Sequence, residues 1–242
     1  MSDLLVNDED GLRTITLNRP AKRNAITMAM YAGLADALAE ATENPDIRVV
    51  LLTGSGGSFT AGNDLKDMAA NPPTGDDAPP LRFLAALHAL RPVLVAEVDG
   101  PAIGVGTTVL PHCDLAYASA RAVFRLPFVD LGLVPEAAST LLLPRLVGAR
   151  KAAELMLFGE PFDAAEALGM GLLNAVAPDA EALREMVSGR VAALTGKPSA
   201  ALAATKRLLR DEQAGTVSER LELDRKVFQS LLRGVKPPDA HP

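Results

Sequence analysis

Short hydrophobic runs rich in Val, Leu and Ile alternate along the chain with longer segments whose apolar positions recur every three or four residues. The runs predict strands at Leu12–Leu17, Val49–Thr53, Val93–Val98, Asp114–Ala118 and Leu172–Val176. The longer segments predict helices at Thr27–Glu43, Leu81–Leu90, Glu136–Leu146 and Lys151–Phe158. This alternation indicates an α/β fold with a largely parallel sheet.

The last third of the chain is mostly helical. Its pattern predicts helices at Ala180–Leu194, Ser199–Arg210 and Val217–Leu232. A length of 242 residues suits one domain, with a core over 1–195 and a helical region over 196–242 where subunit contacts are expected. The segment Ala69–Pro80 has no large apolar residue, which predicts a mobile surface loop or a lid.

Charge and composition exclude several classes of function. The net charge is -6 with Lys and Arg scattered, so neither a nucleic-acid nor a membrane partner is expected. A single cysteine and three unclustered histidines predict no disulfide and no metal site, and His112 and Cys113 are interpreted as packing residues. The acidic start lacks a secretion signal, which predicts a cytoplasmic location.

Two glycine-marked turns carry the first chemical signal. Ser58–Met68 follows a predicted strand, and Asn63-Asp64 within it is typical of a helix N-terminus, where backbone amides are free to bind an anion. Asp99–Gly106 also joins a strand to a helical run, Thr107–His112. Together the turns could place two backbone amides on one carbonyl oxygen, which would stabilise an oxyanion or enolate. Each turn alone also fits an ordinary capped helix.

The combination of these turns with the surrounding segments resembles the crotonase (enoyl-CoA hydratase/isomerase) superfamily over roughly residues 10 to 210. The segments that carry the resemblance are Asn18-Arg19-Pro20, Arg23-Asn24-Ala25, Ser58–Met68, Gly100–Gly106 and Phe158–Leu172. The resemblance implies a spiral of ββα units, a homotrimer or homohexamer, and an acyl-CoA thioester as substrate. No separate cofactor is implied, because coenzyme A is part of that substrate.

The same resemblance assigns positions in the site. It implies an oxyanion hole formed by the backbone N–H groups of Asn63 and Val105. Binding of CoA and substrate is implied for Lys22, Arg23, Ala25, Ala61, Gly62, Asp64, Leu65, Gly104, Phe128, Leu131 and Pro135.

A resemblance to this superfamily does not fix the reaction, so the acid–base residues must decide it. The hydratase pattern has two glutamates, and this chain has Thr108 and Phe128 in their places. Neither side chain can act as a base near neutral pH, which argues against hydration.

Glu136 is the remaining candidate base. It follows Pro135, and the surrounding segment is similar to the peroxisomal-type Δ3,Δ2-enoyl-CoA isomerases, whose single catalytic glutamate occupies this position. The residues alone also fit an ordinary acidic residue in the first turn of a helix. Asp64 is expected to cap a helix, and Asp130 is a weaker second candidate for the base.

The sequence therefore predicts an isomerase that converts a 3-enoyl-CoA ester to the 2-enoyl ester with one glutamate base. Phe128, Leu131, Val134 and Pro135 are expected to form an apolar wall that excludes water and raises the pKa of Glu136. Three alternatives stay open: a ring-epoxide/oxepin-type isomerase, an enoyl-CoA hydratase, and a non-catalytic subunit that binds CoA esters. The resemblance implies a C-terminal helix whose aromatic and basic cluster covers CoA, and either Phe228, Arg233 and Lys236 or a neighbouring subunit is expected to replace part of that cluster.

Overall fold

The computed structural model describes residues 2–210 and 215–232 and is built around a six-stranded sheet. Its strand order is β1-β2-β3-β4-β6-β9, and every neighbouring pair is parallel except β1 and β2. The strands are β1 (Leu4–Glu9), β2 (Leu12–Leu17), β3 (Val49–Gly54), β4 (Val93–Val98), β6 (Leu115–Ser119) and β9 (Ala175–Ala177). The prediction of a parallel-rich α/β fold is confirmed.

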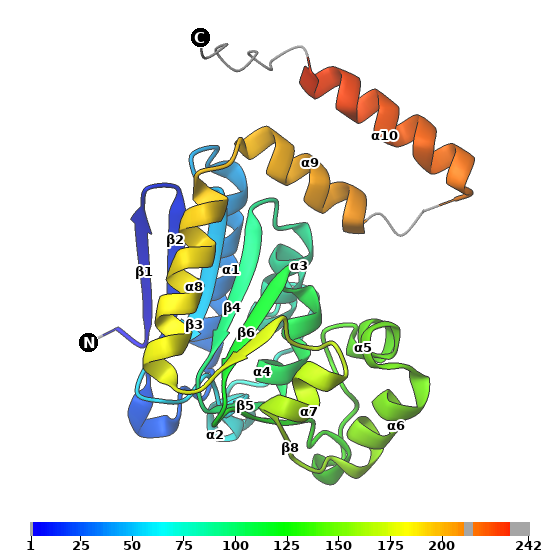
Figure 1. Cartoon of the computed structure of the whole chain (residues 1–242). Helices are drawn as coiled ribbons and strands as arrows, with labels where there is room; N and C mark the ends of the chain where they lie inside the picture. Colours follow the sequence, from blue (N-terminus) through cyan, green and yellow to red (C-terminus); the bar gives the residue numbers. More distant parts are fainter. Residues whose placement is uncertain (1, 211–214, 233–242) are drawn as a thin grey trace.

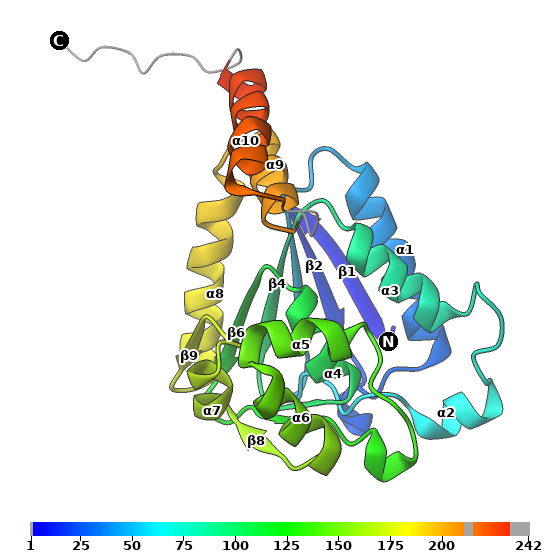
Figure 2. The ribbon, with the colours of Figure 1, turned by 90° about the vertical axis from the view of Figure 1, so that its right-hand side faces the viewer.

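Helices cover both faces of this sheet (Figure 1). On one face, α1 (Met28–Glu43) and α3 (Pro79–Ala89) pack on a core that includes Leu34, Phe83 and Leu94. On the other face, α8 (Ala180–Thr195) buries its apolar stripe against the sheet, and Figure 2 shows α8 and α1 on opposite sides. The sheet is buried on both faces, which explains the continuous hydrophobic runs in its central strands.

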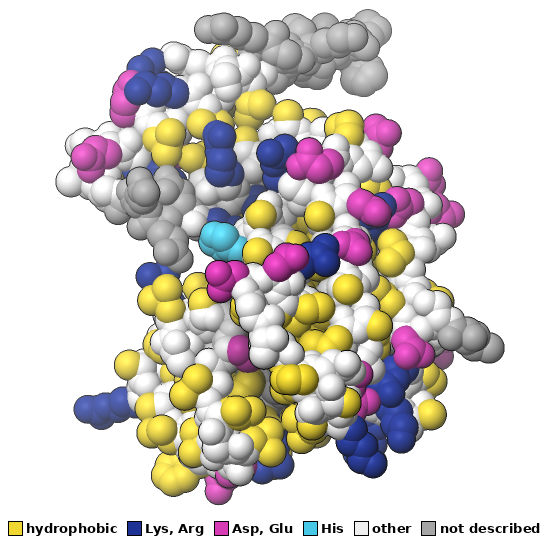
Figure 3. Space-filling view, turned by 180° about the vertical axis from the view of Figure 1, so that it is seen from behind, with side chains coloured by type: hydrophobic (Ala, Val, Ile, Leu, Met, Phe, Trp, Pro, Cys, Tyr) yellow, Lys and Arg dark blue, Asp and Glu magenta, His cyan; other side chains and the backbone are white. Residues whose placement is uncertain are grey.

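A smaller layer lies below the main sheet. It contains a second sheet of β5 (Pro101–Ile103), β7 (Val123–Arg125) and β8 (Phe162–Asp163). Short helices surround it, and they are α2 (Leu65–Ala70), α4 (Val105–Thr108), α5 (Ser139–Val147), α6 (Ala149–Phe158) and α7 (Ala164–Gly169). Seen from behind, hydrophobic side chains gather over the lower part of the molecule, where this layer lies (Figure 3).

The C-terminal helices are α9 (Ser199–Arg210) and α10 (Val217–Leu232), and only α9 is anchored to the sheet. Lys206 and Arg210 both pair with Asp114, at 2.9 Å each, and Lys206 is buried. By contrast, α10 buries no side chain, and its Phe228 is 65% exposed. The other two residues proposed to replace the CoA-covering cluster, Arg233 and Lys236, lie outside the described residues.

Several predicted boundaries were wrong. Helix α5 begins at Ser139 instead of Glu136, because Ala137 and Ala138 have positive φ angles that a right-handed helix cannot contain. The strand predicted over Leu172–Val176 starts only at Ala175, after a turn that buries Leu172. The run Thr107–His112 divides between α4 and a short 3₁₀ turn at Leu110–His112.

The sequence analysis missed four strands: β1, β5, β7 and β8. Strand β1 has only three consecutive apolar residues, Leu4–Val6, before polar and acidic ones, and the other three strands have two or three residues each. No helix among the described residues is long and apolar enough to cross a membrane. Within the same residues, no cluster of three or more potential metal-ligating side chains occurs.

Candidate active site

The segment after β2 is fixed by one buried asparagine. Asn24 has a left-handed backbone and is fully buried. Its side chain accepts a hydrogen bond from the Arg19 amide at 2.8 Å and donates to the carbonyls of Ser55 and Ser58 at 2.9 and 2.6 Å. Because Asn24 ties this segment to the turn after β3, the two loops predicted to bind CoA are held together.

These loops present several of the predicted CoA-binding residues side by side. The Ala61 amide donates to the Arg23 carbonyl at 2.8 Å, which joins the two loops directly. Lys22, Arg23 and Leu65 are exposed, whereas Ala25 and Ala61 are partly buried. Exposed side chains on adjoining loops are available to a ligand.

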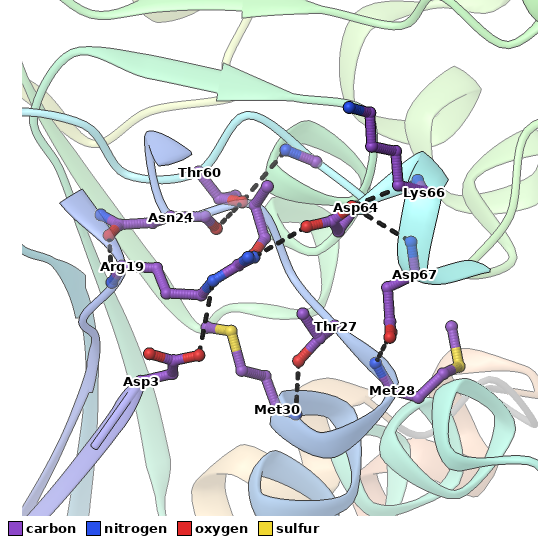
Figure 4. A network of polar contacts seen from close by, with 12 residues as sticks. Asp3, Arg19, Asn24, Thr27, Met28, Met30, Thr60, Asp64, Lys66 and Asp67 are labelled. Atoms are coloured by element: carbon purple, nitrogen blue, oxygen red, sulfur yellow. Dashed lines mark hydrogen bonds and ion pairs between the residues drawn. The ribbon is translucent and has the colours of Figure 1, made fainter. Parts of the chain in front are cut away.

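Asp64 has a structural role in this region, as expected. Its carboxylate caps α2 by accepting from the amides of Lys66 and Asp67, and it pairs with Arg19 at 3.0 Å (Figure 4). These bonds, chiefly the one from the Asp67 amide, hold the pKa of Asp64 below its usual value. The carboxylate is therefore ionised at neutral pH and committed to the loop.

The two glycine turns are in direct contact. A Cβ on Gly62 would lie 2.8 Å from the Ile103 carbonyl oxygen and 3.9 Å from the Gly104 Cα. Gly62 also has a φ of +89°, so both space and conformation require glycine. This close approach places Asn63 next to the turn that carries Val105.

Among the described residues, no hydrogen-bond acceptor is found for the backbone amide of either Asn63 or Val105. Val105 is the first residue of α4, where a free amide is expected. Asn63 precedes the cap of α2, so its amide is free for a different reason. Asn63 forms an isolated parallel bridge with Ile26, but the residues on either side of Asn63 make its two hydrogen bonds. The Ile26 amide donates to the Gly62 carbonyl, and the Asp64 amide donates to the Ile26 carbonyl.

Glu136 lies in the connection between β7 and α5, and its carboxylate turns back toward α4. Thr108 Oγ1 donates to Glu136 Oε1 at 3.2 Å. Thr108 is one turn along α4 from Val105, so the carboxylate contacts the same short helix that begins with the free Val105 amide. Thr108, which occupies the position of the first hydratase glutamate, thus contacts Glu136, the proposed base.

The turn that contains Glu136 is conformationally strained. Ala137 and Ala138 have φ angles of +56° and +50°, and each such residue costs roughly 1–2 kcal/mol when it is not glycine. Two groups hold the turn: Ser139 Oγ donates to the Glu136 carbonyl at 2.5 Å, and His112 Nε2 lies 2.7 Å from the Ala137 carbonyl oxygen. Glu136 therefore precedes the helix, and its interpretation as a first-turn residue was wrong.

Burial dominates the electrostatics of the site. It raises the pKa of Glu136 above its ordinary value, and the hydrogen bond from Thr108 opposes this rise. Burial also raises the pKa of Tyr31 well above its ordinary value, and the charge of Glu136 acts in the same direction. The Tyr31 hydroxyl donates to Asn63 Oδ1, so Tyr31 is a neutral donor that fixes the Asn63 side chain.

The predicted apolar wall is incomplete in the single chain. Phe128 is buried, and its ring lies 4.0 Å from where a Cβ on Gly104 would be. Pro135 is half-buried, but Leu131 and Val134 expose 48% and 81% of their surface. Those two side chains are too exposed in one chain alone to form the expected wall.

Asp130 does not share the surroundings of Glu136. It is exposed and pairs with Arg125 at 2.9 Å, which compensates its charge. A carboxylate with that partner and that exposure has no reason to act as a base.

Sequence reasoning missed Tyr31, His112 and the role of Thr108. Tyr31 and His112 occur among apolar residues and carry no motif of their own. Thr108 was noticed only as the replacement of a glutamate, although a hydroxyl at a position facing the base is itself a signal for a hydrogen-bond donor.

The chain is similar to known proteins of one family. The family described as "Enoyl-CoA hydratase/isomerase" matches residues 7–236. A peroxisomal enoyl-CoA delta isomerase 3 of Mus musculus is 38% identical over 73% of this chain and 57% of its own length. The chain thus spans little more than half of that relative.

Relatives of similar length come from Escherichia coli K12. A 1,2-epoxyphenylacetyl-CoA isomerase is 34% identical over 93% of this chain and 88% of its own. A 2,3-dehydroadipyl-CoA hydratase is 34% identical over 96% and 91%. Among solved structures, an enoyl-CoA hydratase/isomerase from Pseudoalteromonas atlantica T6c is 39% identical, covers 96% of this chain and 92% of its own, and superposes with a TM-score of 0.84.

Proposed function

Because the chain belongs to the enoyl-CoA hydratase/isomerase family, we propose that it is an acyl-CoA isomerase that moves a double bond from the 3-position to the 2-position. The observation that carries this proposal is the arrangement around Glu136. The partly buried Glu136 carboxylate contacts Thr108 of α4, the helix that begins with the free Val105 amide, and Thr108 itself stands at the first of the two positions where the hydratase pattern has a glutamate. One base supports proton transfer within the substrate, whereas hydration needs a second group to activate water.

The reaction begins with the thioester carbonyl oxygen bound to the amides of Asn63 and Val105. Glu136 removes a proton from C2, and the negative charge moves onto that oxygen as an enolate, which the amides stabilise. Loss of one donor of this kind typically lowers the rate by about 10²–10³-fold. Glu136 then returns the proton at C4 as the double bond forms between C2 and C3.

Burial of Glu136 assists both proton transfers. A carboxyl group with its ordinary pKa of about 4.3 is a weak base toward a carbon acid, and a raised pKa makes it a better one. The Thr108 hydroxyl stabilises the ionised form and so opposes the rise in the pKa of Glu136 that burial causes. The two effects together suit a group that must both accept and release a proton.

The test is a panel of 3-enoyl-CoA esters assayed for the conjugated 2-enoyl product, with the Glu136→Gln variant as comparison. Glutamine keeps the size and can still accept from Thr108 but cannot take a proton. The variant should lose turnover by at least about 10²-fold while its affinity for a CoA ester stays within about threefold. Asp130→Asn is a matched control that should keep full activity, and retained turnover in Glu136→Gln would refute the proposal.

A second candidate is isomerisation of a ring epoxide on a CoA ester, favoured by the similarity to 1,2-epoxyphenylacetyl-CoA isomerase over 93% of the chain. That reaction would also use one carboxylate. Activity on a ring-epoxide ester with none on any linear 3-enoyl ester would select it. Water addition to crotonyl-CoA would instead select the hydratase alternative, and binding without any turnover would select the non-catalytic one.

We also propose that copies of the chain associate into a trimer or hexamer. In support, α10 leaves Leu221 and Phe228 63% and 65% exposed, and Leu209 on α9 is 83% exposed. Apolar area of this kind on two helices is more stable when buried against another chain. Light scattering of the purified protein measures the assembly, and a monomer at micromolar concentration would contradict it.

A further inference from the structure

His112 is the one histidine among the described residues that is buried, with 8% of its surface exposed. It ends the 3₁₀ turn at Leu110–His112, far in sequence from Glu136. Its Nε2 lies 2.7 Å from the carbonyl oxygen of Ala137, the residue that follows Glu136.

The protonation of the ring follows from its surroundings. Burial lowers the pKa of His112, the charges of Arg210 and His88 act in the same direction, and the bond to Ala137 opposes them. The imidazole is therefore neutral at pH 7 and carries one N–H. Because a carbonyl oxygen can only accept, that hydrogen must be on Nε2.

The main chain of His112 is itself held in place. Its carbonyl accepts from the Arg210 guanidinium of α9. Two residues further on, Asp114 pairs with Arg210 and Lys206 at 2.9 Å and accepts from the Leu94 amide at 2.7 Å. The imidazole is thus presented from a rigid base formed by α9 and the central sheet.

The turn on the other side of the bond needs such support. Ala137 and Ala138 are consecutive non-glycine residues with left-handed backbones, which persist only where the surroundings impose them. The Ser139 hydroxyl and amide fix the Glu136 carbonyl, and His112 fixes the next carbonyl along the chain. With both carbonyl directions set, the direction in which the Glu136 side chain leaves the backbone is also set.

We propose that His112 is a positioning residue for Glu136: its Nε2–H, donated to the Ala137 carbonyl, holds the left-handed turn that keeps the carboxylate against Thr108 of α4. This inference rests on the proposed function for its kinetic consequence, but not for its geometry. The imidazole takes no part in proton transfer, because its N–H is committed to a backbone carbonyl.

The kinetic test compares His112→Leu, which removes the donor, with His112→Gln, whose side-chain amide can reach the same carbonyl. A displacement of about 1 Å at a catalytic group can lower the rate by about 10²-fold, so His112→Leu should lose roughly 10–100-fold in kcat with KM little changed. His112→Gln should keep most of the wild-type kcat, because its side-chain amide can donate to the same carbonyl. His88→Leu, which replaces the exposed histidine at the end of α3, is the matched control and should behave as wild type.

Two measurements do not depend on activity. Nitrogen-15 NMR of the wild-type imidazole should show the tautomer protonated on Nε2, and a crystal structure of His112→Leu should show Ala137 out of the left-handed region. A wild-type ring protonated on Nδ1, an unchanged kcat in His112→Leu, or a glutamine variant as impaired as the leucine variant would each overturn the inference. If the wild type isomerises no 3-enoyl ester, the proposed function fails, and the tautomer and the turn still decide the role of His112.

Discussion

Replacing Thr108 by valine removes one hydroxyl from the site and changes little else, because the two side chains have nearly the same shape. The hydroxyl is buried, lies 3.2 Å from Glu136 Oε1, and has a weaker alternative acceptor in the Val105 carbonyl at 3.5 Å. A hydrogen bond to a charged group contributes about 1.5–3 kcal/mol, and the length of this one favours the lower end of that range. Its loss should therefore favour the protonated carboxyl group by about tenfold.

The sign of the effect is fixed by the structure. The bond from Thr108 lowers the pKa of Glu136, while burial raises it, so Thr108→Val leaves burial unopposed and raises the pKa further. In the pH dependence of kcat, the acidic limb should shift to higher pH by about one unit. The value of kcat on the plateau should change less.

The assay follows the absorbance of the conjugated thioester between pH 5 and pH 9. Thr108→Ser keeps the hydroxyl and should reproduce the wild-type limb. Carbon-13 NMR of the Glu136 carboxyl group measures the same shift without turnover. If the Thr108→Val profile superimposes on the wild-type profile, the hydroxyl does not act on Glu136, and the reasoning fails.

Two further predictions concern stability. Because burial raises the pKa of Glu136 in the folded chain, the unfolded chain loses this proton at lower pH, and the free energy of unfolding falls as the pH rises from the ordinary value to the raised one. Glu136→Gln should therefore have a higher Tm than wild type at pH 8 and nearly the same Tm near pH 4; a lower Tm at pH 8 would contradict this. Gly62→Ala should lower the free energy of unfolding, measured in urea, by about 1–3 kcal/mol more than Gly75→Ala does. Both glycines have φ near +90°, but only at Gly62 would the added Cβ meet a backbone oxygen, that of Ile103 at 2.8 Å. Equal costs would show that backbone strain alone matters.

Much of the fold could be predicted from hydrophobic periodicity. Four of the five predicted strands agree with the structure to within a residue or so: β3, β4 and β6 are largely buried and mostly apolar, and β2 alternates between more and less buried residues. The exposed edge strand β1 has only three consecutive apolar residues, and the strands of the second sheet are two or three residues long, so they were missed. The boundary at Glu136 failed for another reason: no local pattern announces left-handed alanines, which long-range contacts impose.

The candidate site divides in the same way. The sequence by itself determined the family resemblance, the two glycine turns and the absence of both hydratase glutamates, and with that resemblance it predicted Glu136 as the base. Only the tertiary structure decided that Thr108 contacts Glu136, that Tyr31 fixes Asn63, and that His112 supports the turn after Glu136. Each of these contacts joins residues more than 20 positions apart. Their side chains carry no local signal for one another, because the chemistry of each depends on which neighbour the packed core brings within hydrogen-bonding distance.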